Sequence, residues 1–374
     1  MPDRLGFSAV WPISLQVGLF VRAGSSAHPV PEARTTGARK TLQFRPGGAT
    51  HWPVYSHVKS SLTMAIAIRL DTPLRITVLA GGDSAEREVS LESGACVAHA
   101  LRERGHNVLL FDPARRALNE IACDTDVVFP MLHGTGGEDG ILQQSLDQLR
   151  IPWFGSSAAA SALTFDKAAT RRILANAGLP VAPGIALPHD AKTDQIHIAS
   201  RRIGYPQVVK PAAQGSSVGI SIVDAESEID RAAIEAARWS HTILIEKYIA
   251  GREITVPVIN GEIYPVIEIL PAVRWYDYSA KYSDESTRYH VSPDNMPANL
   301  SDIVLAACEV CGVAGISRTD LRIDPDGEPW ILEINTIPGM TSHSLVPMSI
   351  RAHGQSVGEL CERLLLATIT KAKA

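Results

Sequence analysis

The 374-residue sequence predicts an α/β protein with more than one domain. Strand-like and helix-like segments alternate between Leu74 and Leu132, which is typical of an open parallel sheet. Farther along, Asn260-Gly261 is a strong hairpin turn between two strand-like runs. The chain is also long enough for two or three domains of ordinary size. The sequence therefore predicts a parallel α/β unit followed by a part that contains hairpins.

The first unit is expected to begin with a strand at residues 75–80 that ends in a pair of glycines. A helix follows at residues 90–105, where apolar side chains recur near helical spacing and Gly105 can end the helix. Strands at residues 107–111 and 126–132 complete the alternation. Ligands of such units bind at the carboxyl ends of the parallel strands.

The rest of the chain is expected to open with a helix at residues 165–177 and to continue mainly as strands. Residues 271–297 show no clear period, and a segment of that length is usually a functional loop. The other expected elements are strands at residues 207–210, 219–223, 242–248, 253–259, 262–269, 315–323 and 330–334, and helices at 229–237, 300–311 and 357–368.

Composition excludes several classes of protein. With 45% apolar and 20% charged residues, the chain is neither disordered nor collagenous. Five cysteines are too few for a disulfide scaffold and favour a reducing, cytoplasmic location. A net charge of -5 gives no general attraction to nucleic acid or anionic lipid, and no apolar run approaches the length of a membrane span. We therefore expect neither nucleic acid nor membrane as a partner.

Residues 1–63 differ in charge from the rest. They carry seven basic and two acidic side chains, against 28 and 38 in residues 64–374. Six prolines also interrupt any helical or strand period. We expect this segment to be an extension outside the fold, either disordered or the result of a start codon assigned too early, with Met64 as the true first residue. A targeting segment is the alternative.

Two strands near the end of the chain carry a candidate metal site. With a period of two, Arg318 and Asp320 share one strand face, and Glu333 and Asn335 share one face of the next strand. Two carboxylates and an amide oxygen suit Mg²⁺, and an arginine beside them can stabilise charge on a transferring group. A strand pair that faces water is the alternative. The alternate positions are apolar: Leu321, Ile323, Leu332 and Ile334.

A Gly/Ser-rich loop at residues 214–219 follows Lys210 at the end of a strand. Backbone N–H groups of such a loop can surround phosphate oxygens while the lysine supplies positive charge. The loop lacks the Gly-Lys-Ser/Thr ending of a P-loop, so by itself it is equally consistent with a solvated hairpin loop.

In their order, these and other motifs resemble the D-alanine–D-alanine ligases of the ATP-grasp superfamily. The resemblance covers about residues 74–366 and leaves the first 63 residues out. The matching motifs are Gly-Gly-x-Ser-x-Glu-x-Glu-Val-Ser at 81–90, His-Gly-x-x-Gly-Glu-Asp-Gly at 133–140, Asp166-Lys167, Lys210-Pro with Gly-Ser-Ser-Val-Gly at 215–219, Tyr276-Asp-Tyr with Lys281-Tyr282, Arg-x-Asp at 318–320, and Glu-x-Asn-Thr-x-Pro-Gly-Met-Thr-x-x-Ser at 333–344.

The resemblance implies a three-domain ATP-grasp fold with an N-terminal open parallel α/β domain. The implied domains are residues 74–165, 166–252 and 253–374. The implied activity is ATP-dependent joining of two D-alanines through D-alanyl phosphate, for peptidoglycan precursor synthesis, by a homodimer. The alternatives are a related ligase with D-serine or D-lactate as second substrate, and a catalytically inactive sensor of nucleotide or D-alanine.

Residues that would hold ATP and metal follow from the same resemblance. Two Mg²⁺ ions, with Mn²⁺ as a substitute, would be bound by Asp320, Glu333 and Asn335. The lysines and the loop would hold the phosphates, Glu246 and Lys247 the adenine, and Glu253 the ribose. The implied ATP-binding set is Lys167, Lys210, Gly215, Ser217, Glu246, Lys247, Glu253, Lys281 and Arg322.

For the amino-acid substrates, the resemblance implies that Glu86 binds the ammonium of the first D-alanine, with His133 near its carboxylate. Ser344 and the Leu345 backbone would hold the second carboxylate. Arg318 and the Gly339 N–H would stabilise the oxyanion. Tyr282, Ser216 and Glu86 would form a hydrogen-bonded latch that closes the 271–297 loop. Relatives that form an ester usually carry Phe at the position of Tyr282, so the tyrosine favours D-alanine.

The chain departs from the family pattern at a few positions. Gln144, Ser317 and Thr319 are unusual there, and Arg322 stands where an apolar side chain usually lies beneath the adenine. Because a guanidinium can stack on a base, we expect Arg322 to pack against the nucleotide. Cys308 and Cys311 lie on one face of an expected helix, and we expect them to pack as small apolar side chains rather than to bind zinc.

Overall fold

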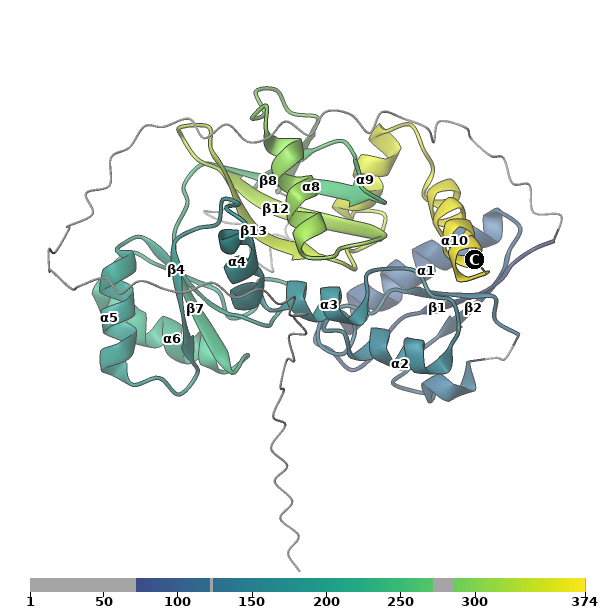
Figure 1. Ribbon diagram of the computed structural model, residues 1–374, viewed down its shortest axis with the longest axis horizontal. Helices are drawn as coiled ribbons and strands as arrows, with labels where there is room; N and C mark the ends of the chain where they lie inside the picture. The colour runs from purple at the N-terminus through teal and green to yellow at the C-terminus, as the bar shows by residue number, and fades with distance from the viewer. Residues whose placement is uncertain (1–71, 122–123, 272–285, 374) are drawn as a thin grey trace, which may run out of the picture. The chain divides into compact units, whose positions relative to one another are not determined.

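The computed structural model describes residues 72–121, 124–271 and 286–373, all within one compact unit that spans residues 68–374. Its strands form three sheets (Figure 1). The expectations for residues 1–63, Lys281, Tyr282 and most of the predicted 271–297 loop lie outside the described residues. None of the described helices is long and apolar enough to cross a membrane.

The first sheet is the parallel α/β unit that the sequence predicts. Its strands run in the order β2-β1-β3, and both neighbours of β1 are parallel to it. Helix α10, from the end of the chain, packs against α1 and β3, so Leu101, Phe129 and Leu364 share one core. The elements are β1 (Arg75–Leu79), α1 (Arg87–Glu103), β2 (Asn107–Phe111), β3 (Val127–Pro130) and α10 (Val357–Lys373).

The second sheet is antiparallel, in the order β4-β7-β5-β6. Helices α5 and α6 cover it, and their apolar faces form a core with Val209 and Ile245 of the strands. Two of these elements were not predicted: β4, whose side chains are largely half-buried without alternation, and the mainly polar α5. The elements are β4 (Gly184–Pro188), α5 (Thr193–Ile203), β5 (Gln207–Pro211), β6 (Ser221–Val223), α6 (Ile229–Ala237) and β7 (Thr242–Lys247).

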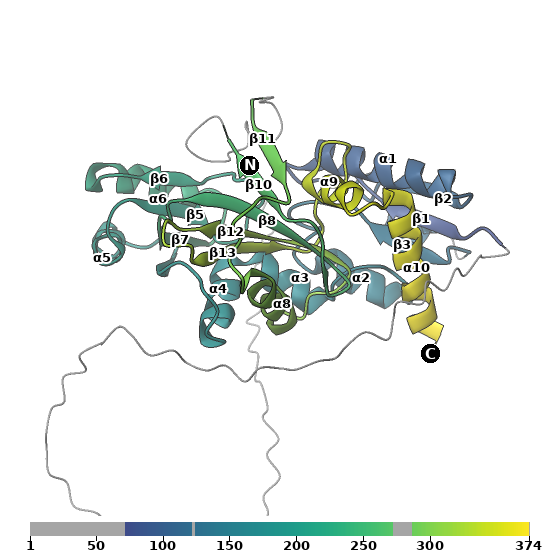
Figure 2. The same ribbon diagram turned by 90° about the horizontal axis from the view of Figure 1, so that it is seen from above.

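The third sheet has the order β11-β10-β8-β12-β13, with β9 paired to β8 (Figure 2). All of these pairs are antiparallel, and helix α8 packs on one face of the sheet. The prediction of one strand at residues 262–269 was wrong: the segment holds two short strands, with Pro265, which has no N–H to donate, between them. The elements are β8 (Arg252–Ile259), β9 (Glu262–Ile263), β10 (Ile267–Leu270), β11 (Arg288–Val291), α8 (Leu300–Val310), β12 (Ile316–Ile323) and β13 (Pro329–Asn335).

The predicted helix at residues 165–177 holds the last residue of one helix and the whole of the next. Phe165 is the last residue of one, and Asp166 caps the next by accepting hydrogen bonds from the N–H groups of Ala168 and Ala169 at 2.9 and 3.0 Å. This cap places Lys167 at the start of a helix. The remaining helices are α2 (Ile141–Leu149), α3 (Ala158–Phe165), α4 (Lys167–Asn176) and α9 (Leu345–Ala352), with short 3₁₀ helices η1 (Leu118–Glu120) and η2 (Glu226–Glu228).

Candidate active site

Strands β12 and β13 bring the predicted metal-site residues together. In their antiparallel register, Asp320 lies opposite Glu333 and Arg318 lies opposite Asn335, so the two strands are neighbours, as predicted. The Arg318 guanidinium donates two hydrogen bonds of 2.8 Å to the Asp320 carboxylate. Thr255 of β8 donates a third hydrogen bond, of 2.6 Å, to Asp320 Oδ1. The strand register therefore fixes a compact polar patch with oxygen ligands and a guanidinium.

A β-bulge beside this patch corrects one detail of the prediction. The register shifts between Asp320 and Leu321, so that Leu321 pairs with Ile331 and Leu332 has no partner opposite it. Ile331 and Ile334 are buried in the core beneath the sheet, whereas Leu332 is only half-buried. The apolar face therefore does not follow strict alternation, because the bulge inserts one residue into β13.

Lys167, the first residue of helix α4, adds a positive charge next to Glu333. Its Nζ lies 3.0 Å from Glu333 Oε2 and donates a hydrogen bond of 2.7 Å to the carbonyl of Gln214. Burial by itself would lower the pKa of Lys167, but neighbouring carboxylates, led by Glu333, raise it above its usual value. The ammonium therefore stays charged between the metal-site strand and the Gly/Ser loop.

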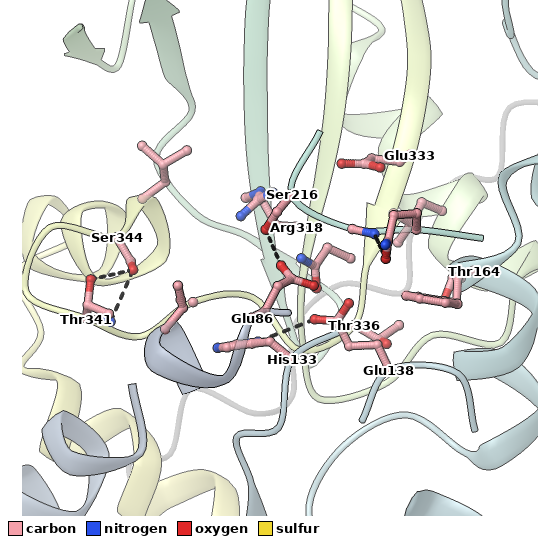
Figure 3. A pocket seen from close by; sticks show the side chains of 18 of the residues that line it. Glu86, His133, Glu138, Thr164, Ser216, Arg318, Glu333, Thr336, Thr341 and Ser344 are labelled. Atoms are coloured by element: carbon pink, nitrogen blue, oxygen red, sulfur yellow. Dashed lines mark hydrogen bonds and ion pairs between the residues drawn. The ribbon is translucent and has the colours of Figure 1, made fainter. Parts of the chain in front are cut away.

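The Gly/Ser loop meets the first unit of the chain at Glu86. The Ser216 hydroxyl donates a short hydrogen bond to Glu86 Oε1 (Figure 3). A Cβ atom at Gly134 or Gly215 would lie 2.5 Å from Glu86 Oε2, so both positions need glycine for the loops to approach the carboxylate this closely. Ser216 and Ser217 adopt positive φ angles of 50° and 59°, a strained conformation for residues with side chains. The structure thus brings together two of the three predicted latch residues.

His133 follows strand β3 and belongs to a buried hydrogen-bonded group. Its Nδ1 lies 3.4 Å from Glu138 Oε1, and its Nε2 lies 3.2 Å from the Ser93 hydroxyl, which accepts a hydrogen bond from the Met340 N–H. Burial raises the pKa of Glu138, although His133 partly opposes this. Glu138 and Ser93 were missed as site residues. Glu138 stands inside the quoted 133–140 motif, but nothing in the sequence shows that it faces His133.

The start of helix α9 also lies beside these residues. Ser344 precedes its first residue, Leu345, and its Oγ accepts a hydrogen bond of 3.1 Å from the Thr341 N–H. A Cβ at Gly339 would lie 2.9 Å from the same oxygen. The first N–H groups of a helix have no partner within it, so the start of α9 suits an anion.

These elements line one cavity of about 200 Å³. Figure 3 shows Glu86, His133, Arg318, Glu333 and Ser344 around it. Eleven of the residues singled out in the sequence line it: Glu86, His133, Lys167, Gly215, Ser216, Arg318, Glu333, Asn335, Gly339, Ser344 and Leu345.

Of the other expected nucleotide-binding and metal-binding residues that the structure describes, none lines this cavity. Several of them pair with one another. Lys210 Nζ lies 2.5 Å from Glu246 Oε2, and both side chains are buried between β5 and β7. Glu253 and Arg322 form a second pair, at 2.8 Å, on β8 and β12. Lys247, by contrast, is exposed at the end of β7. Their roles toward ATP stay predictions, as does the stacking of Arg322 on adenine.

The cysteine pair is part of the core. Cys308 and Cys311 are free thiols buried beneath the third sheet, as expected for small apolar side chains. Burial raises the pKa of the Cys311 thiol to about 11. Within the described ranges, no three His, Cys, Asp or Glu side chains gather where they would hold a metal ion. The candidate metal site instead combines two carboxylates with the Asn335 amide.

Known proteins are similar to this chain in sequence and in fold. A family model described as D-ala D-ala ligase C-terminus matches residues 173–366, and one described as D-ala D-ala ligase N-terminus matches residues 112–156. The chain belongs to the D-alanine–D-alanine ligase family. A D-alanine–D-alanine ligase of Anaeromyxobacter sp. (strain Fw109-5) is 43% identical over 310 residues, which cover 80% of this chain and 99% of the relative.

Solved structures of family members extend the likeness to the fold. The crystal structure of a D-alanine–D-alanine ligase from Bacillus anthracis complexed with ATP matches with a TM-score of 0.70 and 30% identity, over 80% of this chain and 99% of that chain. A ligase structure from Coxiella burnetii matches with a TM-score of 0.69 and 26% identity, over 80% and 96%. The three sheets are therefore those of the ATP-grasp fold of D-alanine–D-alanine ligases, as expected.

Proposed function

We propose that the protein joins two D-alanines into D-alanyl-D-alanine with ATP as co-substrate, through a D-alanyl phosphate, and so supplies peptidoglycan precursor synthesis. The observation that carries the proposal is that Glu86, Arg318 and Glu333 line the same cavity. It offers an anion for an ammonium group, a cation for a developing oxyanion, and an acid for a metal. Membership of the D-alanine–D-alanine ligase family supports the same reaction.

The loops would hold the first D-alanine. The Glu86 carboxylate would pair with its ammonium group, and the Ser216 hydroxyl, already hydrogen-bonded to Glu86, would orient that carboxylate. His133 would lie near the substrate carboxylate, held in place by Glu138 and Ser93. Closure of the site around an acyl phosphate matters because water would otherwise hydrolyse it. Tyr282 would complete the latch in this proposal.

The second D-alanine would enter from the side of α9. Ser344 and the Leu345 N–H would bind its carboxylate at the helix N-terminus. Its amine would attack the carbonyl carbon of D-alanyl phosphate, with loss of a proton from nitrogen and release of phosphate. Arg318 and the Gly339 N–H would stabilise the oxyanion that forms on the way, a contribution worth roughly 10²–10³ in rate for each donor.

The donors at β12 and β13 fit Mg²⁺, and Mn²⁺ as a substitute. Asp320, Glu333 and Asn335 offer hard oxygen ligands on two adjacent strands. Two cations pair with the carboxylates: Arg318 with Asp320, and Lys167 with Glu333. Bound there, the metal would neutralise negative charge on the ATP phosphates. Lys167, Lys210 and the backbone and Ser217 of the Gly/Ser loop would hold the phosphates, with Lys281 in the same role.

Three coarser features belong to the same proposal. The enzyme would act as a cytoplasmic homodimer, with domains at residues 74–165, 166–252 and 253–374. Because α10 packs on the first sheet, the first and last of these domains share a core. Light scattering on the full chain would give twice the monomer mass if the homodimer is correct, and the monomer mass if it is not.

Product formation tests the proposed reaction directly. The full chain, supplied with ATP, Mg²⁺ and D-alanine, should release ADP and phosphate and form a dipeptide detected by mass spectrometry. L-Alanine should give neither product. D-Serine and D-lactate should be tested as second substrates beside D-alanine. If the enzyme prefers either of them, the proposal that D-alanine is the second substrate is wrong. ATP binding without any ligation product would instead identify an inactive sensor.

A further inference from the structure

Arg322 is a buried cation of the third sheet that the proposed reaction steps do not use. It lies on β12, on the same strand face as Arg318 and Asp320, and directly opposite Glu253 of β8 in the register. Only 9% of the residue is exposed. A buried guanidinium is retained at little cost only where its donors find partners, so its contacts define what it does.

The side chain of Arg322 contacts the segment that joins the second and third sheets. Its Nη2 lies 2.8 Å from Glu253 Oε2. Its Nη1 donates to the Gly251 carbonyl at 3.3 Å and to the Tyr248 hydroxyl at 3.4 Å. The guanidinium carbon also lies 5.4 Å from the centre of the Tyr248 ring. One side chain on β12 therefore holds the connection between β7 and β8 and the carboxylate that follows it.

The backbone makes this connection tight. Gly251 has a φ of 120°, and a Cβ there would lie 2.0 Å from the Ile323 carbonyl oxygen, so the turn runs directly against β12. Glu253 comes two residues later, with a side chain that is 15% exposed. A carboxylate that pairs with a guanidinium in such a place is held in one position, and a carboxylate held in position is a strong acceptor for hydroxyl groups.

We propose that Arg322 is a positioning residue that fixes Glu253 for hydrogen bonding to the nucleotide ribose, and thereby sets the preference for ATP over 2′-deoxy-ATP. This inference rests on the proposed function and on the role that the family resemblance gives to Glu253, which is to hold the ribose of ATP. A carboxylate that accepts a hydrogen bond from the 2′-hydroxyl raises the affinity for ATP but not for 2′-deoxy-ATP, which lacks that hydroxyl. Arg322 touches Glu253 rather than the reacting atoms, so its removal should act on nucleotide affinity and not on the chemical step.

Calorimetric binding of Mg-ATP and Mg-2′-deoxy-ATP to the full chain tests this inference without requiring ligation. Arg322→Met keeps an unbranched side chain, shorter than that of arginine, and removes the guanidinium. It should weaken ATP binding about tenfold, as expected for loss of one well-placed charged hydrogen bond, and leave 2′-deoxy-ATP binding nearly unchanged. Glu253→Gln should give the same loss of discrimination, and the double variant should lose no more than either single variant. Arg322→Lys, which retains the charge, should fall between Met and wild type.

Arg252→Met is the matched control. Like Arg322, Arg252 pairs with a glutamate of this sheet: it donates hydrogen bonds of 2.7 and 2.8 Å to Glu268. These contacts do not involve Glu253. It should lower the melting temperature and keep the ATP to 2′-deoxy-ATP ratio. The inference is overturned if Arg322→Met weakens both nucleotides equally, or if Glu253→Gln changes the ratio and Arg322→Met does not. Wild-type protein that forms no dipeptide would count against the proposed reaction alone, because the binding ratio is read independently.

Discussion

The two sides of the cavity are built on different principles. On one side, Arg318, Glu333 and Asn335 line the cavity from adjacent strands, with Asp320 next to them on β12, and the β12–β13 register fixes their spacing. On the other side, Glu86 and Ser216 come from loops that lie 130 residues apart and meet through one hydrogen bond. A sheet holds its side chains by many backbone hydrogen bonds, whereas a loop contact depends on the few groups that make it.

This difference separates two tasks of the proposed enzyme. Charge on the transferring phosphoryl group is best stabilised by groups that do not move, because a preorganised site needs no rearrangement during the reaction. Substrate entry and release require loops that part and meet again. We therefore expect substitutions on the strand side to lower kcat, and substitutions on the loop side to act more on KM.

Asp320→Asn should have the largest effect. The substitution preserves shape but removes a charged oxygen ligand and the acceptor pair for Arg318, so kcat should fall by about 10³-fold or more. The steady-state rate of ADP release measures this. Asp324→Asn is the control, since Asp324 lies just beyond the same strand and accepts its hydrogen bonds within a turn and from Trp330. Equal kinetic losses in both variants would show that the strand position of Asp320 has no special role.

Arg318→Lys should have the next largest effect. Lysine keeps the charge but cannot form the two-point grip on Asp320 or present a planar fork to an oxyanion. We expect kcat to fall about 10²-fold while KM for D-alanine changes little. Rapid-quench measurement of acyl transfer would locate the loss in the chemical step. A rise in KM with unchanged kcat would instead show that Arg318 binds the substrate and not the transition state. The expected kinetic difference between the strand side and the loop side would then be wrong.

Ser216 tests the loop side. Ser216→Ala removes the hydroxyl that holds Glu86 and should raise KM for D-alanine about 10-fold, because hydrogen bonds to charged groups contribute about 1.5–3 kcal/mol. Ser216→Gly removes the same hydroxyl but also relieves the positive φ of this residue. Similar KM values for the two variants would assign the effect to the hydroxyl. A nearly normal KM for the glycine variant would assign it to the backbone conformation.

The same contrast explains which features were predictable. The spacing of Arg318, Asp320, Glu333 and Asn335 followed from a period of two, because hydrogen bonding in a sheet is regular. The bulge at Leu332 did not follow, since nothing in its own side chain marks it. The approach of Ser216 to Glu86 was expected only through the family resemblance, because no local pattern relates loops that are so far apart in the chain. Glu138 was missed for a different reason. It lies only five residues from His133, but no pattern in the sequence shows that the turn between them brings the two side chains together.

The smallest expected effect concerns the anchor of the loop side. Asp112, at the end of the first sheet, accepts hydrogen bonds from Arg87, the residue after Glu86, and from the Gly82 N–H, and chiefly the Arg87 guanidinium lowers its pKa to about 2. A carboxyl with a lowered pKa stabilises the fold above its unfolded pKa near 4, and this stability is lost as the pH falls toward 2.

Asp112→Asn should therefore cost about 1 kcal/mol at pH 7, a value reduced for solvent screening, and lower the melting temperature by about 2–4 °C. The difference from wild type should shrink steadily below pH 4. Asp124→Asn, at an exposed pair with Arg75, should change the melting temperature far less. A pH-independent loss in the Asp112 variant would mean that packing, and not the charge pair with Arg87, anchors this end of the loop side.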